Sequence, residues 1–347
     1  MREGRTTVYN NITSPEKLEK VNPANTELED DFIEYLKSVD RAQSTILQYT
    51  AGLHVIWCWN LEYNNNIPFV DFTKRQIAKF QNHALTVWKW SPARIRMIKS
   101  VARSLETFIT NILDEEYPDY REKWNKIESP VNEAVREKSV FTDAELQPLL
   151  DYLVENEDYM KACFLSLAIN SGRRKSELAR FKVSYFDDSN LICEGALYKT
   201  PEKMTTKGRG SKGKLLYVYT LAKPFKPYLD LWLKYREENG IDSDWLFPKC
   251  QNGKWVDEPV STSTFDSYAN AFSNFLGKPF YAHSMRHNLC TRLAENNIPS
   301  NVIKDLFGWS SVALVDIYSD IDAEDNFEKY FGAEGIKQVE KKTLEDL

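Results

Sequence analysis

Apolar residues recur at helical spacing along almost the whole chain, and this periodicity restricts the fold more than any other feature of the sequence. Start signals for helices, such as Ser44, Thr73 and Ser91-Pro92, stand before several of the apolar stripes. The protein is therefore expected to be mainly α-helical. In the first third of the chain, the pattern predicts four amphipathic helices: Asp30 to Val39, Ser44 to Glu62, Thr73 to Trp90, and Pro92 to Leu113.

A charged stretch that contains Pro118 and Pro130 interrupts the periodicity after the fourth helix. Such a composition is typical of an interdomain linker. Because 347 residues with 42% hydrophobic content can bury more than one core, we expect two domains. The expected order is a polar leader (1–27), a helical domain (28–117), a linker (118–137), a second domain (138–331) and a tail (332–347).

The second domain is also expected to be mostly helical, with one short β-region. A capping pattern at Thr142 opens its first helix. Between Asn190 and Leu221, two predicted strands, Leu191 to Cys193 and Lys214 to Leu221, flank a glycine-rich basic turn at residues 207–213, which predicts a small antiparallel sheet with a basic tip. Further helices are expected at Tyr159 to Ser171, Pro224 to Glu238, Thr262 to Leu276, His283 to Asn296, Pro299 to Leu306, and Val312 to Tyr318.

The average charge of the chain hides a strong asymmetry along it. A formal net charge of -6 argues against a nucleic-acid partner, because neutralising phosphates supplies much of the affinity for DNA. Two basic runs oppose this conclusion, although each run alone is better explained as a solvated surface. The runs are Lys74, Arg75, Lys79, Lys89, Arg94, Arg96, Lys99 and Arg103, then Lys199, Lys203, Lys207, Arg209, Lys212, Lys214, Lys223 and Lys226.

The sequence also gives expectations about compartment. The five cysteines are odd in number and scattered, and no C-x-x-C pair occurs, so neither a disulfide framework nor a zinc site is expected. No run approaches the roughly 20 apolar residues of a membrane span. The first residues lack the apolar stretch of a secretory signal. We therefore expect a cytoplasmic protein without a membrane partner.

Four separated segments of the second domain carry side chains suited to phosphate chemistry. They are Ser171-Gly-Arg-Arg-Lys-Ser-Glu-Leu178, the basic hairpin, His283-Ser-Met-Arg-His287, and Phe307-Gly-Trp-Ser-Ser311 with Tyr318 beyond it. In this order they resemble the tyrosine recombinase, or phage integrase, family of Cre-like, Xer-like and lambda-integrase-like proteins. The resemblance covers residues 140–331 by motif, whereas residues 28–117 are similar to the family's helical (SAM-like) core-binding domain only in pattern.

The resemblance implies a role for each residue that matches a motif. The arginine of the first box falls on Arg174, and Arg173 stands where the family more often has an apolar residue. Arg173 therefore remains the alternative to Arg174 for this role. The catalytic lysine belongs at the hairpin tip, where Lys207 fits best and Lys212 and Lys214 remain alternatives. The other matching residues are Glu177, His283, Arg286, His287, Trp309 and the nucleophile Tyr318.

The chemistry of phosphodiester transfer explains why these residue types are needed. Attack on phosphorus spreads negative charge over the non-bridging oxygens, which fixed cations such as Arg174 and Arg286 stabilise with forked donors. His283 can help to manage a proton, and Trp309 can donate through its indole N–H. A phenol such as that of Tyr318 conserves the phosphodiester in a covalent ester, so no metal, ATP or other cofactor is expected.

Lys207 is a plausible acid for the departing 5′ oxygen, which is a poor leaving group unless it is protonated. Glu177 is expected to orient the site rather than to transfer protons.

Ordinary structural roles compete with several of these assignments. Trp309 could be a core aromatic, as could Tyr318, and an arginine after a glycine could simply cap a helix. A metal site at His283 and His287 is disfavoured because the glutamate of an H-E-x-x-H motif is absent and no third ligand is evident.

The resemblance implies a C-shaped clamp that pairs two double-stranded DNA sites as a homotetramer and exchanges strands through a Holliday junction. Integration and excision of a phage or mobile element is the first expectation, and dimer resolution or inversion is the second. A type IB topoisomerase and a DNA-binding protein without catalysis are the rivals. Accessory DNA-bending proteins and docking of the tail on a neighbouring protomer are left open. The expected DNA-binding residues are Lys74, Arg75, Lys89, Arg94, Arg96, Lys99, Arg103, Arg209 and Lys212.

Overall fold

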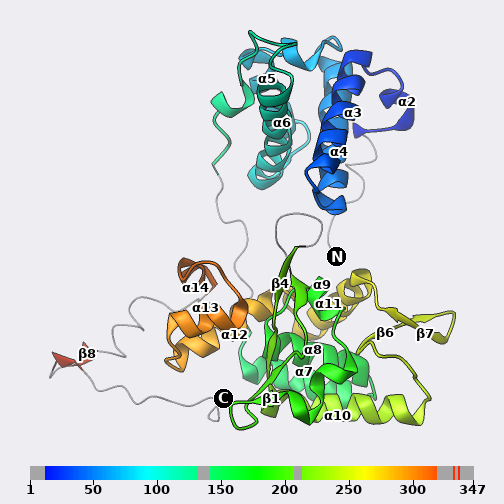
Figure 1. Ribbon diagram of the computed structural model, residues 1–347, viewed down its shortest axis with the longest axis vertical. Coiled ribbons are helices and arrows are strands. Elements are labelled where there is room, and N and C mark those ends of the chain that lie inside the picture. The colour runs from blue at the N-terminus through cyan, green and yellow to red at the C-terminus, as the bar shows by residue number, and fades with distance from the viewer. Residues whose placement is uncertain (1–11, 132–140, 207–212, 319–330, 333–334, 337–347) are drawn as a thin grey trace. The chain divides into compact units, whose positions relative to one another are not determined.

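The computed structural model describes residues 12–131, 141–206, 213–318, 331–332 and 335–336, without the side chains after residue 315. The chain divides near residue 136 into two compact units, and each is described by itself (Figure 1). Unit 1 contains the helices α2 (Pro15–Leu18), α3 (Pro23–Ser38), α4 (Gln43–Tyr63), α5 (Lys74–Thr86) and α6 (Pro92–Ile112), and the short 3-10 turns η1 (Phe69–Asp71) and η2 (Trp124–Lys126).

The four helices predicted for the first domain are present, with shifted ends. Thr73 and Gln76 form a capping box at the start of α5. Ser91 caps α6, and Pro92 occupies its first turn. α5 ends at Thr86 instead of Trp90, and the chain turns at Lys89, which has a positive φ of 53°. Caps therefore fix the starts of α5 and α6 as predicted, whereas α3 begins at Pro23 instead of at the predicted Asp30.

The segment expected to be a polar leader is folded from residue 12 onward. Ile12 and Val21 are buried in the core of unit 1, and α2 and the first turn of α3 lie in this segment. Its polar residues bond to the rest of the unit: the backbone N–H of Asn22 donates to Asn66 Oδ1 at 2.9 Å, and its side-chain amide donates to Asn66 O at 2.8 Å. Polar side chains that are satisfied in this way give no apolar periodicity, which explains the wrong prediction.

The beginning of the predicted linker is also packed into unit 1. Trp124 is fully buried in the core. The buried carboxylate of Glu106 on α6 accepts hydrogen bonds from the backbone N–H of Lys123 at 2.6 Å and of Trp124 at 3.0 Å, and from the Tyr120 hydroxyl at 2.9 Å. The packed unit therefore extends well beyond residue 118.

Unit 2 is built around α8 (Tyr159–Ser171), whose last ten residues are all buried. The other helices of the unit are α7 (Asp143–Glu155), α9 (Lys175–Leu178), α10 (Ala222–Glu238), α11 (Thr262–Leu276), α12 (Ser284–Glu295), α13 (Ser300–Phe307) and α14 (Ala313–Tyr318). A helix that is apolar on every side belongs in the centre of a domain, and α8 packs against α7, α10, α12 and the strand β5 (Tyr219–Leu221).

The β-structure of unit 2 consists of short antiparallel strands. The strand predicted from Lys214 to Leu221 is interrupted at Tyr217 and Val218, so its halves belong to different sheets. The sheet β1-β2-β5 combines β1 (Leu191–Ile192), β2 (Leu197–Lys199) and β5 (Tyr219–Leu221), and β3 (Met204–Thr206) pairs with β4 (Lys214–Leu216). β6 (Pro248–Gln251) and β7 (Lys254–Pro259) form an unpredicted hairpin, and β8 (Phe331–Gly332) pairs with β9 (Gly335–Ile336).

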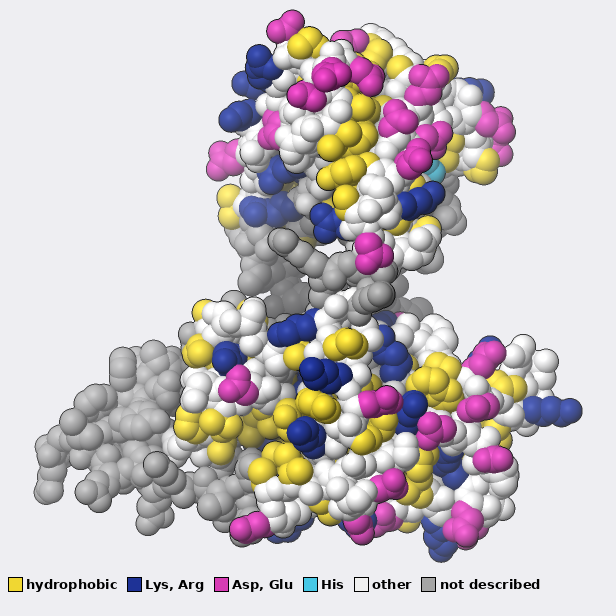
Figure 2. Space-filling model, viewed as in Figure 1, with side chains coloured by type: hydrophobic (Ala, Val, Ile, Leu, Met, Phe, Trp, Pro, Cys, Tyr) yellow, Lys and Arg dark blue, Asp and Glu magenta, His cyan; other side chains and the backbone are white. Residues whose placement is uncertain are grey.

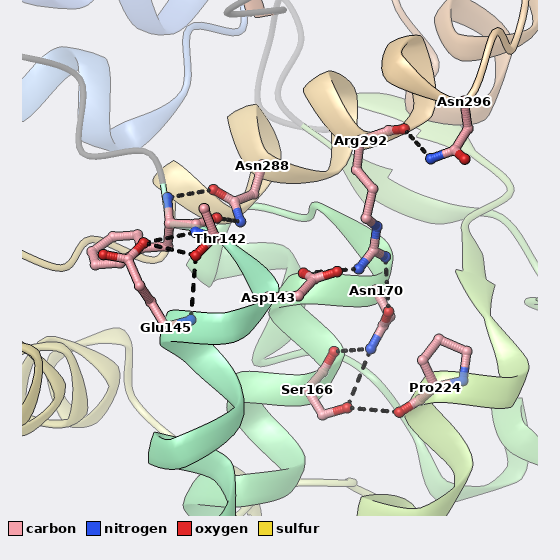
Figure 3. A network of polar contacts seen from close by, with 10 residues as sticks. Thr142, Asp143, Glu145, Ser166, Asn170, Pro224, Asn288, Arg292 and Asn296 are labelled. Atoms are coloured by element: carbon pink, nitrogen blue, oxygen red, sulfur yellow. Dashed lines mark hydrogen bonds and ion pairs between the residues drawn. The ribbon is translucent and has the colours of Figure 1, made fainter.

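Polar bonds anchor α12 to the neighbouring helices (Figure 3). Asn288 accepts the backbone N–H of Phe141 at 3.0 Å and donates to the carbonyl of the same residue. One turn further along α12, Arg292 donates to Asn170 Oδ1 on α8 at 3.1 Å and reaches Asp143 at 3.5 Å. These bonds hold α12, which carries the second sequence motif, in a fixed position against α7 and α8.

Within the described residues, every helix is too short or too polar to cross a lipid bilayer.

Candidate active site

The first motif begins where α8 ends. Gly172 has a φ of +57°, a left-handed conformation that terminates the helix. A Cβ atom on Gly172 would lie 2.5 Å from the ring of Phe307 on α13. The glycine therefore allows both the sharp turn and the close approach of the first and third motifs.

The structure distinguishes the two neighbouring arginines that follow Gly172. The Arg174 side chain is 31% exposed, and its Nη1 donates to Glu177 Oε1 at 3.0 Å. Glu177 is buried, and its carboxylate holds the partly exposed guanidinium of Arg174 in place. Arg173 is only 1% exposed; its Nη2 donates to Leu306 O at 2.6 Å and its Nη1 to Phe307 O at 3.4 Å. Arg174 is therefore the arginine of this pair that can meet a phosphate.

Arg286, from the second motif, joins the first and third motifs. Its Nη1 donates to Gly172 O at 3.0 Å, and its Nη2 donates to Phe307 O at 3.4 Å. The guanidinium carbon lies 4.7 Å from the ring centre of Phe307 and 5.0 Å from that of Trp309. Arg286 is only 1% exposed, so its guanidinium is covered by these neighbours. The last carbonyls of α8 and α13 need donors, and Arg286 supplies them.

The third motif turns at Gly308 immediately after α13. Gly308 has a φ of +67°, and a Cβ there would collide with the Leu216 side chain of β4. Trp309 is buried, and its indole stacks on Phe307 with ring centres 4.6 Å apart. Lys214 Nζ, at the start of β4 next to the hairpin turn, donates to Gly308 O at 3.3 Å. The β3-β4 hairpin therefore reaches the third motif, and Lys214 lies beside it.

The two histidines of the second motif occupy the start of α12. His283 is exposed at the N-cap position, and His287 is half-buried one turn later. Their rings are 5.7 Å apart and nearly perpendicular. Among the described residues, His, Cys, Asp and Glu side chains form no group of three that could hold a metal ion.

The predicted nucleophile stands at the end of α14. This helix packs on α12 and α13, and Cys290 Sγ of α12 donates to Val315 O at 3.8 Å. The backbone of Tyr318 therefore closes a helix that contacts the elements of the second and third motifs. The Tyr318 side chain lies outside the described part of the chain, as do Lys207, Arg209 and Lys212.

The basic residues of unit 1 fall into two classes. Lys74, Arg75 and Lys89 are exposed, and the Arg94 guanidinium lies 5.1 Å from the ring centre of Trp90. Arg103 is half-buried. Lys74, Arg75 and Lys89 are accessible to a charged partner.

Arg96 and Lys99 instead fasten the chain that leaves unit 1. Lys99 Nζ is buried and donates to Gln81 Oε1 at 2.8 Å and to Ile127 O at 2.6 Å. Burial lowers the pKa of Lys99 to about 8. The Arg96 Nη2 atom donates to Pro130 O at 2.9 Å. These contacts argue against Lys99 as a DNA contact, and they occupy Arg96 as well.

Sequence reasoning missed the structural part of this site. Arg173 was noted only as a departure from the motif, and Phe307, whose carbonyl accepts from two arginines, gave no signal at all. Lys199 and Lys203 also lie over the ring of Tyr217, at 4.4 and 5.7 Å from its centre. Figure 2 shows Lys and Arg side chains gathered over β4 and the neighbouring strands on the visible face of unit 2.

Comparisons with known proteins agree with this arrangement. Residues 139–325 match the model of the phage integrase family. The chain is 26% identical to the SPbeta prophage-derived recombinase-like protein YomM of Bacillus subtilis (strain 168), over 76% of this chain and 77% of that protein. It is also 26% identical to tyrosine recombinase XerC of Pseudomonas fluorescens (strain Pf0-1), over 56% of this chain. The match spans only 59% of the length of that XerC.

Solved structures share the fold. A XerH site-specific recombinase bound to its difH substrate is similar with a TM-score of 0.60 and 17% identity, over 88% of this chain and 83% of that chain. A lambda integrase dimer bound to a core site gives a TM-score of 0.60 and 16% identity, over 91% and 99% of the two chains. The family model covers more than half of the chain and includes every motif that meets at the site. The chain belongs to the phage integrase family of tyrosine recombinases.

Proposed function

We propose that the protein is a site-specific recombinase that cuts and rejoins DNA one strand at a time through a covalent 3′-phosphotyrosine link at Tyr318. The observation that supports this most is the convergence of three distant motifs. Arg286 of the second motif bonds to Gly172 of the first motif, which precedes Arg174. It also contacts the turn from Phe307 to Trp309 in the third motif. Helix α14 packs against α12 and α13, which carry the second and third motifs.

In this proposal Arg174 stabilises the charge on the non-bridging phosphate oxygens. Its guanidinium is partly exposed and is held by the buried carboxylate of Glu177 at 3.0 Å. A guanidinium that is already oriented loses little entropy when it binds a phosphate. His283 is exposed at the start of α12, where its ring can reach a phosphate oxygen or the proton of the nucleophile.

Arg286 supplies the second cation in this proposal. Of its two carbonyl bonds, the one to Phe307 O is the longer, at 3.4 Å. A phosphate oxygen is a stronger acceptor than this distant carbonyl, because a charge-assisted hydrogen bond is shorter and stronger than one to a neutral acceptor. We propose that Arg286 exchanges this bond for a phosphate oxygen and keeps the 3.0 Å bond to Gly172 O. Trp309 then supplies an indole donor and a wall that excludes water.

The chemical step joins Tyr318 Oη to phosphorus and breaks the bond between phosphorus and the 5′ oxygen. The phenol proton passes to a base such as His283, and a hairpin lysine gives a proton to the departing oxygen. Lys207 is the proposed acid, with Lys212 and Lys214 as alternatives. Lys214 already lies at the third motif, through its bond to Gly308 O at 3.3 Å. Attack by a free 5′ hydroxyl on the phosphotyrosine reverses the step, so the reaction requires no ATP or metal.

We further propose that unit 1 binds the DNA backbone through Lys74, Arg75, Lys89 and Arg94. Phosphate contacts of this kind position a protein without reading sequence. The matched XerH structure is bound to its difH substrate and the lambda integrase structure to a core site, which supports a DNA substrate for this chain as well. A homotetramer that pairs two sites on intracellular DNA is part of the same proposal.

Integration or excision of a mobile element is the proposed role. The matched Bacillus subtilis relative is described as prophage-derived, which favours this role over dimer resolution, the alternative supported by the Xer relatives. Plasmids that carry the target sites on one molecule or on two test the choice. Efficient joining of two different sites on separate molecules supports integration, whereas a preference for identical repeats on one molecule supports resolution.

The covalent step can be tested with nicked suicide DNA prepared from regions that flank the gene, in buffer with a chelator and without ATP. We expect a denaturant-resistant adduct that mass spectrometry maps to Tyr318. Tyr318→Phe should bind the same DNA without an adduct, and Tyr281→Phe serves as the control that keeps it. An adduct at another tyrosine would refute the assignment of Tyr318 as the nucleophile. Tight DNA binding without any adduct would refute the covalent step and favour a binding protein. Relaxation of supercoils on DNA without a target site would instead favour a type IB topoisomerase.

A further inference from the structure

We propose that Arg173 is a positioning residue of the cleavage site, which fixes the C-terminal end of α13 and thereby holds Trp309 and Arg286 in place. The inference rests on the proposed function, but its structural part can be measured without DNA. It gives a role to the side chain that departs from the family motif.

The first argument is the pair of bonds that Arg173 makes. The last carbonyls of a helix have no partner within the helix and need donors from elsewhere. Arg173 reaches two consecutive ones, Leu306 O at 2.6 Å and Phe307 O at 3.4 Å. Arg286 donates to the same Phe307 carbonyl at 3.4 Å. The two arginines therefore share one acceptor, so a shift of that carbonyl changes the position of both.

The second argument is that Gly308 and Trp309 are held rigidly to the end of α13. The backbone N–H of Gly308 donates to Asp305 O at 3.0 Å, and that of Trp309 donates to Lys304 O at 2.9 Å. The Trp309 ring stacks on Phe307 with an angle of 14° between the planes. Gly308 is held against Leu216, which leaves the turn little room to move. A displacement at the end of α13 is consequently passed on to the indole.

The third argument concerns energy. Taking a guanidinium out of water costs several kcal/mol, and an apolar side chain of similar volume often gives equal or greater stability. Burial lowers the pKa of Arg173 to about 10, so the side chain stays charged at neutral pH. The buried Glu177 nearby offsets part of the cost, because its charge favours the cation. Stability alone does not account for a charge here, whereas precise placement of two carbonyls does.

The test compares Arg173→Met and Arg173→Lys with Arg236→Met as a matched control. Arg236 is also a buried arginine of unit 2 that binds backbone carbonyls, with Nη1 at 2.6 Å from Trp245 O. Its carbonyl partners belong to residues 243–246, outside the motifs of the cleavage site. The readouts are the single-turnover cleavage rate at saturating protein, the Kd for DNA, and hydrogen exchange of the Gly308 and Trp309 amides.

We expect Arg173→Met to slow cleavage by about a hundredfold, as a misplacement of about 1 Å does, while the Kd for DNA changes little. Exchange at Gly308 and Trp309 should become faster. Arg173→Lys should restore part of the rate, because an ammonium can still serve one carbonyl, and it also replaces Arg173→Met if that variant does not fold. Arg236→Met should leave the cleavage rate of the folded protein unchanged.

Unchanged exchange at Gly308 and Trp309 in folded Arg173 variants would overturn the positioning role, whatever the DNA assay gives. Equal cleavage rates in wild type and both Arg173 variants would also overturn it. Absence of cleavage in the wild type would refute the proposed function, and faster exchange in the variants would then still support the structural part of the inference.

Discussion

Substitution of Gly172 by alanine tests the packing that joins the first and third motifs. At a φ of +57° an alanine is strained by about 1–2 kcal/mol. Its Cβ would also lie 2.5 Å from the Phe307 ring, and overpacking of this kind costs about 1–3 kcal/mol. The two costs sum to a loss of about 2–5 kcal/mol in the free energy of unfolding of unit 2.

Gly240 offers a matched control within the same unit. Its φ of +62° imposes the same strain, but nothing lies within 4 Å of its Cβ position in the described part of the chain. Gly240→Ala should therefore lose only about 1–2 kcal/mol. Equilibrium urea unfolding of both variants separates the strain from the contact.

The contact also predicts a difference in activity. If the Phe307 ring moves to make room for the added methyl group of the Gly172→Ala variant, the Arg286 and Trp309 side chains that pack on it must move too. Cleavage should fall much more in Gly172→Ala than in Gly240→Ala, when both are measured on folded protein. Equal losses of stability and of rate in the two variants would refute the close approach of Phe307.

Four further predictions concern single groups. If the 5′ bridging oxygen of the substrate is replaced by sulfur, the leaving group needs no proton. This DNA should therefore restore cleavage by the Lys207→Met variant. Restored cleavage by the Lys214→Met variant instead would identify Lys214 as the acid. Glu177→Gln keeps the shape but not the charge that orients Arg174, so single-turnover cleavage should slow with little change in DNA binding. Lys74→Ala and Arg75→Ala should each lower the slope of log Kd against log salt by about one unit, whereas Lys99→Met should not change it. The pKa of Lys99 is lowered to about 8 in the folded state, so in the range between this value and the ordinary lysine pKa unfolding takes up a proton. The free energy of unfolding should therefore rise with pH across this range. Urea unfolding of the Lys99→Met variant at several pH values should lack this rise.

The helices, and those starts that carry a cap recognised in the sequence, could be predicted because their causes are local; the start of α3, expected at Asp30, lies at Pro23. The capping box of Thr142 and Glu145 forms as its sequence indicates, and α8 covers the predicted range Tyr159 to Ser171. The family motifs likewise depend on short spacings, and the phage integrase match covers all of them. Features of this kind need only a few neighbouring residues to be recognised.

The remaining features depend on contacts between distant residues. Lys99 looks like a surface cation in the sequence, but its partner carbonyl at Ile127 is 28 residues away. Trp124 lies among charged residues and prolines, and its backbone N–H donates to the carboxylate of Glu106, 18 residues away in the sequence. The covering of Arg286 required knowledge of where α8 and α13 end in space. The type of a single residue does not indicate which distant residue it contacts in the folded chain.

The acceptor shared by Arg173 and Arg286 belongs to the backbone of Phe307, so no side-chain substitution at residue 307 can remove it. A mutational scan of this position would report the packing of the ring and give no information about the carbonyl. A leucine there would retain both arginine bonds while losing the stacking with Trp309. The hydrogen bonds at this carbonyl can therefore change only through substitution of the two donors, Arg173 and Arg286. Evolution can adjust these bonds by varying the two arginines.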